Sequence, residues 1–140
     1  PLYPKGVKER ATVDQWIDFT SMHVGMALQK VTYNRVFATR IGASVDENSI
    51  KEGLKFLDRF LPIVDDQLGK NKYLTGNQLT LADINLLALL DPSEVSGVDL
   101  SKYNNVVRWR QALKQESFYI MCHKEYGEAF KQTAAAKNNS

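Results

Sequence analysis

Apolar residues along most of this chain recur at the three- and four-residue spacing of amphipathic helices. No stretch bounded by turn residues alternates with the two-residue period of a half-buried strand, and no Asn-Gly or Asp-Gly pair marks a hairpin. The pattern therefore predicts an all-α fold, a five-helix bundle that forms one domain.

The first predicted helix runs from about Val7 to Ile41 and is ended by Gly42. Its core side is aliphatic and carries Val13, Ile17, Val24, Leu28 and Val31. A second stripe, roughly opposite, carries larger side chains: Phe19, Met22, Met26, Tyr33 and Phe37. Because the helix is apolar on two sides, it needs two partners, and its own domain supplies only one.

The second predicted helix begins near Ser44 or Asp46, because Ser44 and Glu47 have the spacing of a capping box, and it ends near Gly69. Its apolar ladder continues in phase past Pro62, so we expect a kink there and not a break. The ladder consists of Ile50, Leu54, Leu57, Leu61, Val64 and Leu68.

A central helix is predicted to start at Thr80. Thr80 and Asp83 have capping-box spacing, in which the hydroxyl and the carboxylate each bind the other residue's backbone amide. The run from Leu81 to Leu90 is apolar on almost every side, which is typical of a helix buried in the middle of a core. Asp91-Pro92 is expected to end or bend this helix.

The fourth helix is predicted over residues 104–115, with Val106, Trp109 and Leu113 inward, and the fifth begins near Ser117. The inward stripe of the fifth helix is expected to contain Phe118, Met121, Cys122, Tyr126 and Phe130. We divide the chain into a linker over residues 1–6, a helical domain over residues 7–131 and a polar tail over residues 132–140.

Composition narrows the classes of partner. The net charge of +2 is too small to favour nucleic acid or a membrane surface, and 44% hydrophobic with 24% charged residues is ordinary for a globular protein. No apolar run reaches the roughly 18 residues that span a bilayer. A single cysteine fits a reducing compartment, so we expect a cytoplasmic protein.

Candidates for chemistry are few, and we predict no catalytic residue and no metal ligand. His23 and His123 lack neighbouring residues at metal-ligand spacing, and no nucleophile accompanies His23. A buried, inert thiol is favoured over a reactive one for Cys122. The adjacent Asp65 and Asp66 point apart on a helix, so a solvated face is favoured over a carboxylate pair.

Three segments carry a resemblance to a known family. The segment from Gly76 to Asp83, which is Gly-Asn-Gln-Leu-Thr-Leu-Ala-Asp, resembles the Gly-x-x-x-Thr-x-Ala-Asp motif of the glutathione transferase C-terminal domain. Leu2-Tyr-Pro-Lys5 is similar to the family's interdomain linker. Segment 97–109, which is Gly-Val-Asp-Leu-Ser-Lys-Tyr-Asn-Asn-Val-Val-Arg-Trp, is similar to a segment of the family that also ends in Arg-Trp. Asn104 stands where the family usually has proline. The closest resemblance is to theta- or delta-like members.

The resemblance implies a division of labour. In this family an N-terminal thioredoxin-like domain, which is not in this sequence, binds the co-substrate glutathione, so we expect the chain alone to bind no cofactor and to be inactive. The C-terminal domain supplies part of a homodimer interface and much of the pocket for a hydrophobic electrophile. Met22, Met26, Tyr33 and Phe37 are the residues we assign to this pocket, with packing or a dimer contact as the alternative.

A second class of function stays open. Translation elongation factor 1 gamma, some aminoacyl-tRNA synthetases and small scaffold proteins of synthetase complexes carry similar helical domains that serve assembly. In such a protein the Met and aromatic stripe would be a protein contact surface and not a substrate pocket.

Overall fold

The computed structural model describes residues 1–124, and within this range it is helical without any strand, as predicted. The first long helix is continuous from Val7 to Phe37. It consists of α1 (Val7–Phe19), the π-helical stretch η1 (Thr20–Gly25), α2 (Met26–Thr32) and the π-helical stretch η2 (Tyr33–Phe37). The other elements are α3 (Glu47–Lys70), α4 (Leu81–Leu90), the single turn α5 (Ser93–Ser96), α6 (Asn104–Leu113) and a helical segment over 117–124.

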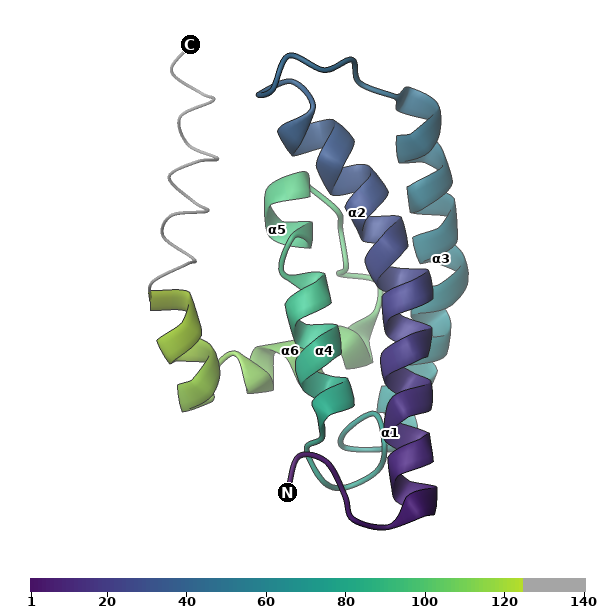
Figure 1. Ribbon diagram of the computed structural model, residues 1–140, viewed down its shortest axis with the longest axis vertical. Helices are drawn as coiled ribbons and strands as arrows, with labels where there is room; N and C mark the ends of the chain where they lie inside the picture. Colours follow the sequence, from purple (N-terminus) through teal and green to yellow (C-terminus); the bar gives the residue numbers. More distant parts are fainter. Residues whose placement is uncertain (125–140) are drawn as a thin grey trace.

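The first long helix and α3 lie side by side, and α4 packs against α1 and η1 (Figure 1). The aliphatic side of the first helix faces this core as predicted, with Val13, Val24, Leu28 and Val31 buried. The α2–α3 contact is close at Gly53, where a Cβ atom would lie 2.7 Å from the carbonyl oxygen of Ala27. Two backbones therefore meet without a side chain between them.

The first helix departs from its prediction in two ways. It ends at Phe37 and not at Ile41, and turns over 38–42 follow, with Gly42 in the left-handed region at φ 71°. The two π-helical stretches widen single turns of the helix. Side-chain hydrogen bonds lie next to both: the Thr20 hydroxyl donates to the carbonyl oxygen of Trp16 at 2.8 Å, and Asn34 Nδ2 donates to that of Lys30 at 2.9 Å.

Helix α3 begins one residue after Asp46, whose Oδ1 accepts hydrogen bonds from the amides of Asn48 (2.9 Å) and Ser49 (3.0 Å). The predicted capping box between Ser44 and Glu47 is therefore wrong, because Asp46 is the N-cap and its carboxylate satisfies two of the free amides of the first turn. Pro62 lies inside α3 without ending it.

Helix α4 is the centre of the fold. It starts directly after Thr80 with a complete capping box to Asp83, and Ala82, Asp83, Leu86, Leu87 and Leu90 are buried along it. The helix ends at Leu90, ahead of Asp91-Pro92. Asp91 keeps helical backbone angles (φ −57°, ψ −40°), and Pro92, which has no backbone N–H group, cannot continue the ladder of helical hydrogen bonds. The short turn α5 then leads through Gly97, at φ 66°, towards α6.

The last described segment corrects a prediction. Val106, Trp109 and Leu113 of α6 are buried as predicted, but Met121 is 72% exposed and Cys122 is exposed, whereas Tyr119 is buried. Tyr119 and His123 both contact Asp91, and these contacts set which side of segment 117–124 faces inward. The predicted inward positions Tyr126 and Phe130 lie outside the described residues. None of the helices over residues 1–124 is long and apolar enough to cross a membrane.

Candidate functional site

The first long helix presents a stripe of large apolar side chains to solvent, which we call the Met–aromatic stripe. Met22 is 61% exposed, Met26 50%, Tyr33 44% and Phe37 37%. These are the four residues that the sequence assigned to a hydrophobic pocket. Val24, Leu28 and Val31 of the same helix are buried, so the helix divides into a core side and an apolar outer side.

An aromatic cluster between the first helix and α3 adjoins this stripe. The ring of His23 stacks on that of Phe60 with centroids 4.3 Å apart, and Phe19 meets both rings edge-on at 5.0 and 6.0 Å. Trp16 extends the cluster by an edge contact with Phe19 at 5.5 Å. These contacts make His23 a packing residue between two helices.

Polar contacts fix the helix that carries the stripe. Asn85 of α4 donates from Nδ2 to the hydroxyls of Thr20 (3.1 Å) and Ser21 (3.0 Å), which lie at the start of η1 just before Met22. Arg35, between Tyr33 and Phe37 in η2, donates to the carbonyl oxygen of Ser96 at 2.9 Å. Each half of the stripe is thus anchored by a side chain to a different part of the domain.

Asp83 is fully buried and holds four hydrogen bonds. Oδ2 accepts from the amide (3.0 Å) and hydroxyl (3.1 Å) of Thr80, and Oδ1 accepts from the amide of Leu74 (2.9 Å) and from Trp109 Nε1 (3.1 Å). Burial raises the pKa of Asp83, and these hydrogen bonds oppose the rise because they favour the charged form. The spacing of the capping box revealed only the Thr80 contacts, since Leu74 and Trp109 come from other elements.

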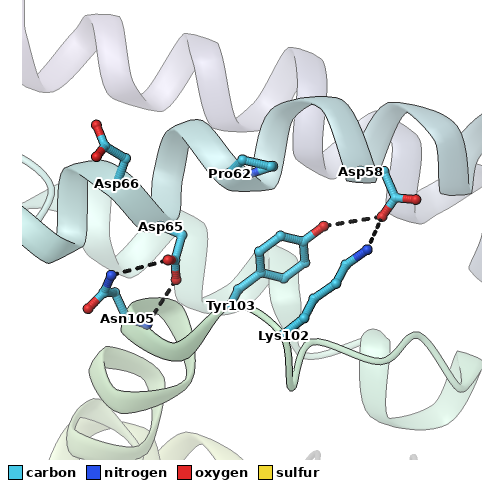
Figure 2. Close-up of a pocket in the computed structure, with 7 residues that line it drawn as sticks. All are labelled: Asp58, Pro62, Asp65, Asp66, Lys102, Tyr103 and Asn105. Atoms are coloured by element: carbon cyan, nitrogen blue, oxygen red, sulfur yellow. Dashed lines mark hydrogen bonds and ion pairs between the residues drawn. The ribbon is translucent and has the colours of Figure 1, made fainter.

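A shallow cavity of about 440 Å³ lies between α3 and residues 102–105 (Figure 2). Its carboxylates serve structural contacts. Asp58 accepts from Lys102 Nζ at 2.5 Å, and this hydrogen bond lowers the pKa of Asp58 against the effect of its slight burial. Asp65 Oδ1 accepts from the backbone amides of Asn105 (2.8 Å) and of the next residue (3.0 Å) at the start of α6.

The prediction that Asp65 and Asp66 occupy a solvated face is therefore wrong for Asp65, which is half-buried and caps α6 from the neighbouring helix. It holds for the exposed Asp66, which pairs with Lys70 one turn later at 2.5 Å. Sequence spacing shows contacts within a helix, and it gives no sign of a cap that another helix supplies.

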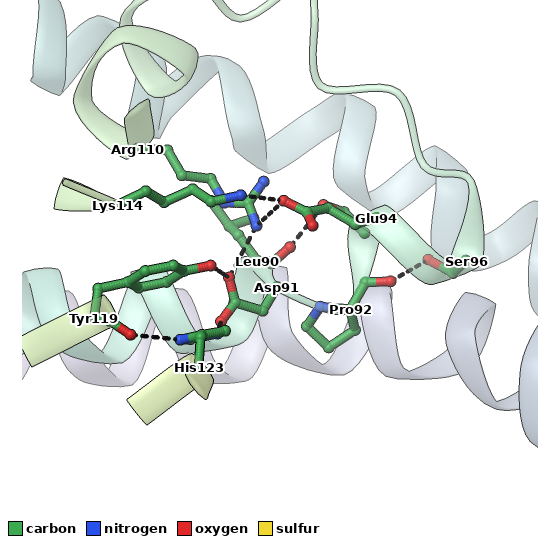
Figure 3. Close-up of polar contacts among 10 residues, drawn as sticks. Leu90, Asp91, Pro92, Glu94, Ser96, Arg110, Lys114, Tyr119 and His123 are labelled. Atoms are coloured by element: carbon green, nitrogen blue, oxygen red, sulfur yellow. Dashed lines mark hydrogen bonds and ion pairs between the residues drawn. The ribbon is translucent and has the colours of Figure 1, made fainter. Parts of the chain in front are cut away.

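Asp91 forms a second polar centre at the end of α4 (Figure 3). Its Oδ1 accepts from Arg110 at 2.9 Å and from the Tyr119 hydroxyl at 3.0 Å, while Oδ2 lies 2.7 Å from Nε2 of His123. Burial raises the pKa of the Tyr119 phenol, and the negative charge of Asp91 raises it further. Among residues 1–124, no group of three or more His, Cys, Asp and Glu side chains is arranged to hold a metal ion.

Comparison with known proteins identifies relatives of this chain. Residues 22–116 match the family described as "Glutathione S-transferase, C-terminal domain". Glutathione S-transferase F10 of Arabidopsis thaliana is 39% identical over 83 residues, which are 59% of this chain and 39% of that protein.

Solved structures agree with this match. Glutathione transferase F2 from Populus trichocarpa superposes with a TM-score of 0.81 at 25% identity, over 91% of this chain and 60% of that one. A delta-class glutathione transferase from Nilaparvata lugens gives 0.77 at 31% identity, over 96% of this chain and 61% of that one. The chain thus spans only part of the length of each of these relatives. Because these relatives are glutathione transferases, the comparisons do not favour the alternative of an assembly domain from a translation factor or synthetase complex.

Proposed function

This chain belongs to the family of glutathione S-transferase C-terminal domains, and we propose that it is the helical half of a transferase that joins glutathione to electrophilic substrates. The reaction forms a bond between the glutathione sulfur and an electrophilic carbon, and a leaving group or a carbanion takes up the displaced electron pair. In this proposal glutathione is the co-substrate, and the chain itself binds no cofactor.

The Met–aromatic stripe supports a role in binding the electrophile. Met22, Met26, Tyr33 and Phe37 expose large apolar surfaces on the side of the helix that its own core leaves uncovered. Aromatic rings give rigid apolar contact, and the unbranched Met side chains adapt to ligands of different shape. A surface of this kind suits varied hydrophobic electrophiles better than one defined polar substrate.

Two side chains with acid–base chemistry have structural contacts: the buried carboxylate of Asp83 is held by four hydrogen bonds, and His23 is packed between aromatic rings. We propose that a thioredoxin-like domain binds and activates glutathione. From the membership of the family we also propose that the complete protein is a homodimer and that it acts in the cytoplasm. The chain alone should not be retained on immobilised glutathione.

The test compares electrophiles of different size in the transferase that contains this chain. Because Tyr33 and Phe37 would line the pocket, replacing both by Ala should change the ratio of kcat/KM for a bulky and a small electrophile by about tenfold, the effect of roughly 1.4 kcal/mol. The KM for glutathione should stay the same. An unchanged ratio would contradict the pocket, and Ile63→Ala, which truncates an exposed apolar side chain of α3, is the matched control.

A further inference from the structure

His123 joins segment 117–124 to the end of α4, and both of its ring nitrogens face hydrogen-bond acceptors (Figure 3). Nε2 lies 2.7 Å from Oδ2 of Asp91, and Nδ1 lies 3.0 Å from the carbonyl oxygen of Tyr119. A carboxylate and a carbonyl oxygen can only accept. Neutral imidazole has one N–H group, whereas imidazolium has two. Only the protonated ring therefore makes both hydrogen bonds.

From this donor count we propose that His123 is a proton-operated clasp, which holds segment 117–124 against the end of α4 when protonated and loosens it when neutral. Either neutral tautomer would leave one nitrogen lone pair facing an oxygen atom. The ring of His123 also stacks on that of Tyr119, with centroids 3.7 Å apart, so movement of the imidazole disturbs this packing as well.

The charges around the clasp come from three elements. At the end of α4, Asp91 presents Oδ2 to His123, because its Oδ1 already accepts from Arg110 of α6 and from the Tyr119 hydroxyl. The guanidinium of Arg110 is only 12% exposed and also lies 3.0 Å from Glu94 of α5.

Glu94 in turn pairs with Lys114 at 2.5 Å. In this group of described residues, the carboxylates of Asp91 and Glu94 therefore balance the positive charges of Arg110 and Lys114. His123 adds a third positive charge to this group, in direct contact with Asp91 at 2.7 Å. A charge-assisted hydrogen bond of this kind is roughly twice as strong as a neutral one.

The direction of the pH effect depends on whether the docked or the loosened form of segment 117–124 favours the protonated ring of His123. The docked segment favours imidazolium, so docking is complete at low pH and weakens as the pH rises and the ring loses its proton. Histidine is the side chain whose charge ordinarily changes between about pH 5 and 8, and the comparison is made across that range.

Hydrogen–deuterium exchange of the amides in 117–124 tests the clasp at pH 6 and pH 8, after correction for intrinsic exchange. We expect corrected exchange to be about tenfold faster at pH 8, since one charge-assisted hydrogen bond is lost. A nitroxide on Cys122, the only cysteine of the chain, should become more mobile over the same range. The same protection and mobility at both pH values would overturn the proposal.

Asp91→Asn is the sharpest variant because it exchanges one acceptor for a donor. Its remaining oxygen can still accept from Arg110 and Tyr119, while its amide N–H group meets Nε2 and so fits neutral imidazole. The pH effect should vanish or reverse.

His123→Gln, which leaves Asp91 in place, should also remove the pH effect. Circular dichroism shows whether each variant stays folded, and the Gln variant decides the matter if the Asn variant does not fold. A pH effect of natural size in either folded variant would refute the clasp.

Discussion

Asp83 shows how one residue can connect three parts of the chain. Its carboxylate binds Thr80 at the start of α4, the amide of Leu74 in the preceding loop, and the indole N–H of Trp109 in α6. A buried carboxylate is stable only when its oxygens are hydrogen-bonded, and here each of the two oxygens accepts two hydrogen bonds. The acid is therefore structural, although burial raises its pKa in the direction often seen at catalytic acids.

Replacing Asp83 by Ala should lower the free energy of unfolding by roughly 3–5 kcal/mol, because it leaves the buried N–H groups of Leu74, Thr80 and Trp109 without an acceptor. Urea denaturation followed by circular dichroism measures this loss. Asp66→Ala is the matched control, since it removes an exposed pair with Lys70 and should cost about 0–0.5 kcal/mol. Equal losses in the two variants would contradict the role given to Asp83.

At the scale of elements, the hydrophobic pattern predicted where the helices lie better than it predicted their internal geometry or which side of the last segment faces inward. The core residues of α3 and α6 recur at helical spacing, so both helices were predicted close to their observed bounds. The π-helical stretches were not predicted, because a widened single turn scarcely changes the spacing of apolar residues. The inward side of 117–124 was also missed, since distant contacts with Asp91 determine it.

The packing of α2 on α3 depends on Gly53. Alanine favours a helix over glycine by about 1 kcal/mol, yet its Cβ would lie 2.7 Å from the carbonyl oxygen of Ala27, which no rotamer change can move. We expect Gly53→Ala to lower the unfolding free energy by about 1–2 kcal/mol, because overpacking outweighs propensity.

Thermal or urea unfolding checks this sign against Gly69→Ala. The nearest atom to that added Cβ is Nδ2 of the Asn105 side chain, which can move if it gives up its hydrogen bond to Asp65 Oδ2 (3.1 Å). The Gly69 variant should therefore lose less stability than the Gly53 variant, or gain some. A stabilised Gly53→Ala protein would show that α2 and α3 can separate without cost.

For the whole molecule, three short motifs were enough to indicate the family, and the match over residues 22–116 confirms it. The exposed stripe could be predicted because four large apolar residues lie opposite an aliphatic core side. The anchors of the stripe could not, because Asn85 and Arg35 act on segments far away in sequence. Binding of an electrophile to the stripe stays a proposal.

Photo-crosslinking gives the most direct measurement of this central claim. A glutathione conjugate with a benzophenone group on sulfur would be bound to the transferase that contains this chain, irradiated, and its attachment sites mapped by mass spectrometry. The proposal predicts attachment on the Met–aromatic stripe, at Met22, Met26 or Tyr33, and its loss with excess unlabelled conjugate. Competable attachment confined to the aromatic cluster of Trp16, His23 and Phe60, or to residues outside this chain, would contradict it.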